Sequence, residues 1–296
     1  VADAELVRTT ETPAAVTSVS FSRDNLKLAI VSADKRVRVY QVADGEPLQE
    51  ITEENAILAA TFAPDNRSIV LGSEGKTVRT WRYVSPIAVR TFTGHGGAVY
   101  GVAFSPDGKQ FASCSADATI RFWSVDGGNQ LKQLTGHTGI VSGLAFSGDG
   151  SLLVSGGADR TVRLWDVAGG RQLKQLASLE EQVYTVAFAP DGKTVAVGGL
   201  DKQVHLINAL TGQRIRSMKH PDYVYRVAFS AKGTRVMSCG YGGNLFVWNT
   251  TDGKPLFEAQ LKKVTHSASY SPDGKRLVTS GGDGRADFIP IPPAAQ

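Results

Sequence analysis

The stretch GHTGIVSGLAFSGDGSLLVSGGADRTVRLWD, residues Gly136–Asp166, contains the pattern that decides the fold. It begins with Gly-His, continues through an alternating apolar run that ends at Phe146, and then makes the turn SGDG. A second and a third apolar run follow, separated by a short turn that contains Gly and Asp. Runs this short, with a period of two and turns about every ten residues, indicate antiparallel β-strands.

The same pattern repeats along the whole chain of 296 residues. The aromatic residue that ends each first run recurs every 41 or 42 residues, at Phe21, Phe62, Phe104, Phe146, Phe188, Phe229 and Tyr270. One four-stranded sheet cannot bury both of its faces alone, whereas seven sheets arranged radially can. The sequence therefore predicts a single all-β domain, residues 1–296, that forms a seven-bladed β-propeller of four-stranded antiparallel blades.

The two ends of the chain indicate how the ring closes. The seventh unit supplies three strands, over about residues 264–270, 276–280 and 286–289, before the chain becomes rich in proline. The stretch Leu6–Thr9 is similar to Ala88–Thr91, which is the fourth strand of the second unit. We therefore expect the N-terminal strand to complete the last blade, which removes two exposed strand edges.

The composition is that of an ordinary soluble protein, with 42% hydrophobic and 20% charged residues. No apolar run approaches the roughly 20 residues of a membrane helix, so we expect no membrane insertion, and a cytoplasmic location is slightly favoured. Two cysteines, Cys114 and Cys239, form no disulfide framework and are expected to be buried and reduced. The net charge of +4 comes from dispersed basic residues, which makes nucleic acid an unlikely partner. We expect a monomer.

On these motifs the chain resembles the WD40-repeat family, in its seven-bladed form, over essentially its whole length. The units Gly136–Asp166 and Gly94–Trp123 carry the resemblance most strongly, and copies such as SPDGKQFASCSADATIRFW resemble bacterial WD40 arrays. The resemblance implies a non-enzymatic scaffold that binds a peptide or a partner protein on the top face of the propeller. It implies no cofactor, and the histidines have no metal-ligand spacing.

The resemblance also implies a buried hydrogen-bond network in two blades. Its members are His95, Ser113, Asp117 and Trp123 in one unit, and His137, Ser155, Asp159 and Trp165 in the next. Ser, His and Asp also make up a catalytic triad. We interpret these residues as structural, because a buried Trp N–H needs an acceptor and the other three side chains can supply it.

Partner-binding residues are expected at the rim of the central channel. The family places there the residues on either side of the first Val of each innermost strand, and the residue before the turn Asp. Small residues dominate these positions in the first four units, and larger ones gather in the last three. The predicted partner-binding residues are Tyr100, Gln182, Tyr184, Leu200, Tyr223, Tyr225, Tyr241 and His266.

Two interpretations of these tyrosines stay open. Tyrosine is enriched in binding surfaces, so they are candidates for contacts with an extended peptide. Alternatively, they pack on one another and fill the channel. The neighbouring Arg226 either pairs with an acidic group or is an exposed strand arginine.

Three other function classes are weaker. An enzyme needs convergent carboxylates or a metal at the channel mouth, where Glu74 and His266 are the titratable groups besides tyrosines, so we expect no catalysis. A regulatory or sensor module cut from a larger multidomain chain is an alternative, which the Val1 start and the Pro-rich end favour mildly. A basic propeller that binds nucleic acid is the last alternative.

Overall fold

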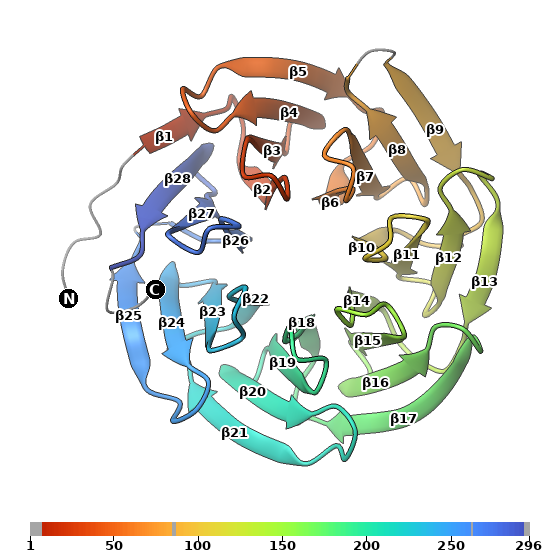
Figure 1. The fold of residues 1–296 in the computed structure, drawn as a ribbon, viewed down its shortest axis with the longest axis vertical. Coiled ribbons are helices and arrows are strands. Elements are labelled where there is room, and N and C mark those ends of the chain that lie inside the picture. The colour runs from red at the N-terminus through yellow and green to blue at the C-terminus, as the bar shows by residue number, and fades with distance from the viewer. Residues whose placement is uncertain (1–7, 85–86, 262, 293–296) are drawn as a thin grey trace.

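The computed structural model describes residues 8–84, 87–261 and 263–292, and in these residues 28 strands form seven sheets. Each sheet has four antiparallel strands, and the sheets stand as blades in a ring around a central channel (Figure 1). The described ranges contain no helix. The predicted all-β, seven-bladed propeller is therefore confirmed.

We number the blades one to seven, and the strands of each blade run from the channel outward. Blades one to three contain β2 Val16–Phe21, β3 Lys27–Ser32, β4 Arg36–Gln41, β5 Pro47–Thr52, β6 Ile57–Phe62, β7 Ser68–Ser73, β8 Val78–Arg82, β9 Ala88–Phe92, β10 Val99–Phe104, β11 Gln110–Ser115, β12 Ile120–Ser124 and β13 Gln130–Leu134. Blades four to six contain β14 Val141–Phe146, β15 Leu152–Gly157, β16 Thr161–Asp166, β17 Arg171–Ser178, β18 Val183–Phe188, β19 Thr194–Gly199, β20 Gln203–Asn208, β21 Arg214–Lys219, β22 Val224–Phe229, β23 Arg235–Gly240, β24 Asn244–Asn249 and β25 Pro255–Gln260. Blade seven contains β26 Ala268–Tyr270, β27 Arg276–Ser280, β28 Arg285–Pro290 and β1 Arg8–Glu11.

The turns between the first two strands of a blade are built by their own side chains. In blade three the Ser105 hydroxyl donates to the Asp107 carboxylate over 2.6 Å, and the same carboxylate accepts the Lys109 N–H. Gly108 takes a left-handed φ of 71°, which favours glycine. The repeated Asp residues of these turns are thus occupied in holding the turn.

The hydrophobic core consists of layers between neighbouring blades. One layer joins Val70 and Val78 of blade two to Phe111 and Trp123 of blade three. The next layer joins Phe122 of blade three to residues of blade four, and the series continues around the ring. Because each blade buries its two faces against its neighbours, the fold depends on the ring being closed.

The N-terminal strand closes the ring, as predicted. β1 pairs with β28, with Thr10 opposite Ala286 and Glu11 opposite Arg285, while Leu6 and Val7 of the predicted strand lie outside the described residues. The innermost strand of blade seven is shorter than expected and begins only at Ala268. Just before it, the Ser280 N–H donates to the Ser267 carbonyl oxygen, while the Ser267 N–H donates to the Ser280 hydroxyl, both over 2.8 Å.

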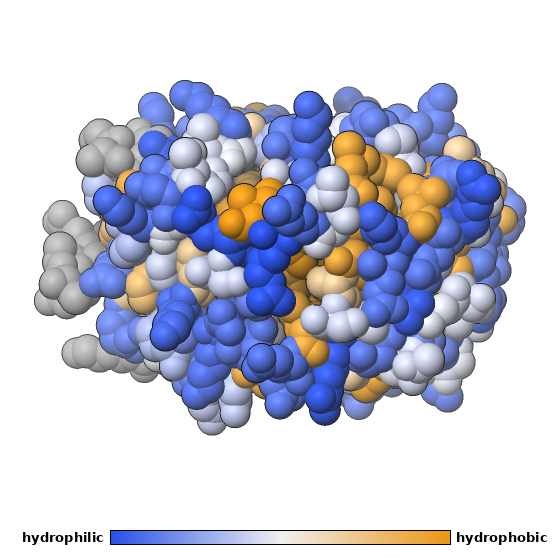
Figure 2. Space-filling view, turned by 90° about the horizontal axis from the view of Figure 1, so that it is seen from below, coloured by the Kyte–Doolittle hydropathy of each residue, from blue (hydrophilic) through white to orange (hydrophobic). Residues whose placement is uncertain are grey.

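The outer side of the ring is mainly hydrophilic, with apolar patches between the charged groups (Figure 2). Exposed apolar side chains on the outermost strands include Leu131, Leu173 and Ile215. The described part of the chain contains no helix with the length and apolar character that a membrane crossing needs.

Cys114 and Cys239 are both buried free thiols, and burial raises the pKa of each.

Candidate partner-binding site at the channel mouth

Blades three and four each contain a continuous chain of hydrogen bonds. In blade three the Trp123 indole N–H donates to Ser113 Oγ over 2.8 Å, and this oxygen lies 2.8 Å from His95 Nε2. His95 Nδ1 lies 2.9 Å from the Asp117 carboxylate. The corresponding distances in blade four are 2.8, 2.7 and 2.8 Å, through Trp165, Ser155, His137 and Asp159.

A neutral histidine satisfies these hydrogen bonds together. The indole can only donate, so the serine oxygen accepts from it, and in this arrangement the serine hydroxyl donates to histidine Nε2. Histidine Nδ1–H then donates to the aspartate. Burial lowers the pKa of His95 and of His137 from the ordinary value, although the neighbouring aspartate opposes this shift. Burial alone would raise the pKa of Asp117, but hydrogen bonds from Thr119, the Gly96 N–H and His95 hold it below its usual range.

These networks have the distances of a Ser-His-Asp triad without its accessibility. Ser113 and Ser155 have no exposed surface, and each serine oxygen is occupied by the tryptophan of its own blade. A substrate cannot reach either oxygen while the blade is folded. The hydrogen bonds join the loop before the innermost strand of each blade, which carries the histidine, to the second and third strands.

Other blades place a different basic residue beside the turn aspartate. Arg38 Nη2 lies 2.6 Å from Asp34 in blade one, and His205 Nε2 lies 2.7 Å from Asp201 in blade five. In blade seven Lys263 Nζ lies 3.2 Å from the turn aspartate Asp283 and also pairs with Asp287 of β28. The sequence analysis missed these pairs, although a basic residue four positions after the turn Asp is a visible signal in blades one and five.

Blade six keeps only part of the network. The Trp248 N–H still donates to Ser238 Oγ over 2.8 Å, but Gly242 stands where the aspartate would be. His220 Nδ1 instead lies 2.8 Å from the Asp222 carbonyl oxygen. His220 Nε2 is buried and has no hydrogen-bond partner among the described residues.

Four of the predicted tyrosines and His266 form one contiguous group at the channel mouth, which we call the aromatic cluster. It joins Tyr184 of blade five to Tyr223, Tyr225 and Tyr241 of blade six, and to His266 of blade seven. The ring centroids of Tyr184 and Tyr225 are 5.5 Å apart, and those of Tyr223 and Tyr241 are 6.1 Å apart. Tyr225 contacts Tyr241 edge-on at 6.3 Å and stacks on His266 at 6.0 Å.

The aromatic cluster is partly self-packed and partly open to solvent. Tyr241 is 52% exposed and His266 is also exposed, whereas Tyr184, Tyr223 and Tyr225 are half-buried. Burial raises the pKa of Tyr184 and Tyr225, so their hydroxyls stay protonated at neutral pH and remain able to donate hydrogen bonds. The rings therefore pack on one another and still present surface to solvent.

The other three predicted residues lie outside the aromatic cluster. Tyr100 lines the channel from β10 and is 40% exposed, but makes no ring contact with any described residue. The Leu200 N–H donates to the Gln182 carbonyl oxygen over 3.0 Å, and both side chains are half-buried. The sequence analysis missed Lys202, whose ammonium lies 5.2 Å from the centroid of Tyr223, a cation–π distance.

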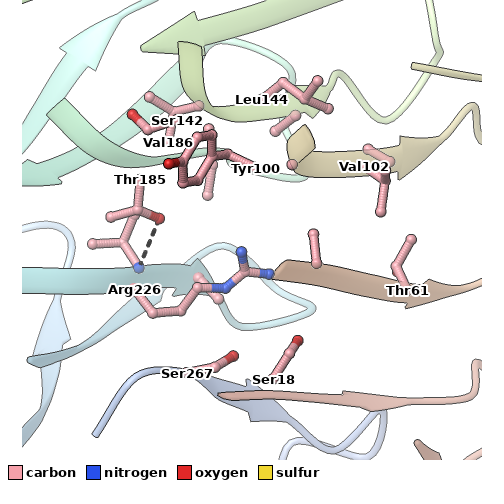
Figure 3. A pocket seen from close by; sticks show the side chains of 18 of the residues that line it. Ser18, Thr61, Tyr100, Val102, Ser142, Leu144, Thr185, Val186, Arg226 and Ser267 are labelled. Carbon is pink, nitrogen blue, oxygen red and sulfur yellow. Dashed lines mark hydrogen bonds between the residues drawn. The ribbon is translucent and has the colours of Figure 1, made fainter. Parts of the chain in front are cut away.

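A cavity of about 620 Å³ follows the channel and is lined by residues of the innermost strands. Arg226 of β22 projects into it (Figure 3). Of the two interpretations of Arg226, the structure agrees with an exposed strand arginine, since the side chain is solvent-exposed and pairs with no acidic residue among the described residues. Across the described residues, no group of three or more His, Cys, Asp or Glu side chains is arranged to hold a metal ion.

The ring of four-stranded blades around a channel defines the class of the protein, a seven-bladed β-propeller. The family model for the WD domain, G-beta repeat (WD40), matches residues 4–41, 87–124, 128–166, 172–208 and 212–249, and the chain belongs to this family. No curated protein matched the chain. WD40 propellers are typically non-enzymatic scaffolds, and the fold generally mediates protein interactions.

Proposed function

We propose that this propeller is a non-enzymatic scaffold that binds a peptide, or an extended segment of a partner protein, across the aromatic cluster. The observation that carries this proposal is the convergence of partly exposed tyrosines from blades five and six with His266 of blade seven. Tyrosine offers a large contact area with few rotatable bonds and a hydroxyl that forms hydrogen bonds, which makes it a frequent anchor of interfaces.

The side chains of the channel support a binding role over catalysis. Among the described residues that line the cavity, the titratable side chains are Arg23, Tyr100, Tyr184, Tyr225, Arg226 and His266. This set contains no carboxylate, and carboxylates are, with histidine, among the common general acids and bases. The aromatic cluster also extends over three blades, which suits an elongated ligand better than a compact substrate.

The double substitution Tyr184→Ala with Tyr225→Ala tests this proposal. A random peptide library displayed on phage is expected to yield enriched sequences on the wild-type protein and none on the double variant. Truncation of an interface anchor costs about 2 kcal/mol or more, which corresponds to roughly 30-fold weaker binding for each tyrosine. The measurement is the dissociation constant of the best selected peptide for each protein.

The matched control is Leu131→Ala with Ile215→Ala. Both side chains are exposed on the outermost strands, to 46% and 47%, far from the innermost strands. We expect this variant to fold and to bind the selected peptide like the wild type. A correctly folded tyrosine double variant that keeps full peptide affinity would refute the proposed site.

A further inference from the structure

Arg226 is an unpaired cation inside the channel. It follows Tyr225 directly on β22, and its side chain lines the channel while staying exposed to the solvent there. No hydrogen bond or ion pair joins its guanidinium to any of the described residues. The surrounding protein lowers the pKa of Arg226 from its ordinary value, but an arginine stays charged at neutral pH.

The ring position of Arg226 explains how the side chain can reach the centre of the channel. Each innermost strand has one residue two positions after its start, and blade seven has a matching residue. These seven residues lie at the same height in the channel and form one level of its wall. Six of the seven are small, and they are Ser18, Ala59, Gly101, Gly143, Thr185 and Ser267. Arg226 is the only long side chain at this level, so the space in front of its guanidinium is left open.

The surroundings of this space fit an anion. Figure 3 shows Ser18 and Ser267 pointing toward the space that the guanidinium enters. The described wall of the cavity contains the cations Arg23 and Arg226 and the histidine His266, but no aspartate or glutamate. A cation that has no partner and lies in a channel without carboxylates attracts an opposite charge.

We propose that the channel receives a carboxylate from the partner peptide, the side chain of a glutamate or an aspartate, and that this carboxylate pairs with Arg226. The inference rests on the proposed function, because it names the partner as an acidic peptide. The guanidinium fork matches a carboxylate with two parallel hydrogen bonds, and such pairs are stronger than neutral hydrogen bonds.

A peptide is the favoured source of the carboxylate because the aromatic cluster adjoins Arg226. The pairing of β22 has an irregularity between Val224 and Arg226, and both Tyr225 and Arg226 line the channel cavity. A peptide held on the aromatic cluster can therefore place an acidic side chain into the channel while its flanking residues contact the tyrosines. A small molecule with a carboxylate would bind Arg226 and the nearby hydroxyls, but it would make no contact with the tyrosines.

The test compares the wild-type protein with Arg226→Met and Arg226→Lys. Methionine fills a similar volume without charge, and lysine keeps the charge without the planar fork. Peptides selected from the random library on the wild type are expected to share one acidic position. Replacing this residue by its amide should weaken wild-type binding about 10- to 100-fold, the range for a hydrogen bond to a charged group. The Arg226→Met variant should bind the acid and the amide peptide equally, and Arg226→Lys should show an intermediate difference.

The outcomes separate this inference from the proposed function. If no peptide is enriched on the wild-type protein, the proposed function itself fails. If peptides depend on Tyr184 and Tyr225 but share no acidic position, or if Arg226→Met keeps the preference for acid over amide, the proposed function stands and the channel inference falls. Binding of N-acetylglutamate as tight as that of the peptide, and lost with Arg226→Met, would assign the carboxylate to a small molecule and overturn the peptide source.

Discussion

Replacing Trp165 by alanine is expected to lower the free energy of unfolding by about 3–5 kcal/mol, the usual cost of removing a large buried aromatic side chain. Trp165 is 1% exposed, packs in the layer between blades three and four, and donates its indole N–H to Ser155. The substitution leaves a cavity and removes the donor that fixes the direction of the hydrogen-bond chain. The midpoint of denaturant-induced unfolding measures this loss.

The control for this variant is Leu173→Ala on β17 of the same blade. Leu173 is 47% exposed, and its truncation should change the free energy of unfolding by no more than about 0.5 kcal/mol. At temperatures where Trp165→Ala stays folded, peptide binding at the aromatic cluster should be retained. Normal stability together with selective loss of binding would show that the network has a functional role instead of a structural one.

The substitution Gly240→Ala is expected to have a second large effect, because it acts on the backbone beneath the aromatic cluster. A Cβ at Gly240 would lie 1.8 Å from the Tyr223 carbonyl oxygen, which accepts the Tyr241 N–H. β22 and β23 must then move apart, at a cost of about 1–3 kcal/mol for an overpacked site. Because Tyr223 and Tyr241 move with this backbone, the affinity for the selected peptide should also fall.

Gly282→Ala is the matched control for this second variant. Gly282 lies in the turn after β27 of blade seven, at the place that Tyr241 occupies in blade six, and no atom lies within 4 Å of a Cβ added there. Its backbone is outside the left-handed region, so alanine fits without strain. We expect stability within about 0.5 kcal/mol of the wild type. Equal stability of Gly240→Ala and Gly282→Ala would contradict the close approach of Tyr223 to Gly240.

The fold could be predicted because its signal is repeated. Seven aromatic residues at intervals of 41 or 42 residues, together with the SPDG-type turns, specify the blade, the number of blades and the direction of the strands. The similarity of the two stretches at residues 6–9 and 88–91 indicated the closing strand. The shortened β26 and the hydrogen bond from the Ser267 N–H to the Ser280 hydroxyl could not be predicted, because the repeat pattern does not encode side-chain contacts.

The candidate site could be predicted only in part. The repeat alignment brought Tyr184, Tyr225 and Tyr241 to one rim, because equivalent positions of neighbouring blades are adjacent in a propeller. It could not show that Lys202 lies against Tyr223, since this contact depends on rotamers. The direction of Arg226 depends on the six small residues at its level, which only the closed ring brings together.

The central claim is that a peptide occupies the aromatic cluster, and tyrosine-selective NMR tests it most directly. The chain has eight tyrosines, few enough for each ring signal to be assigned by substitution with phenylalanine. During titration with the best selected peptide, the signals of Tyr184, Tyr223, Tyr225 and Tyr241 should shift. Those of Tyr40 and Tyr83, which are buried in blades one and two, should stay unchanged. Saturable peptide binding that leaves all four cluster signals in place would contradict the account.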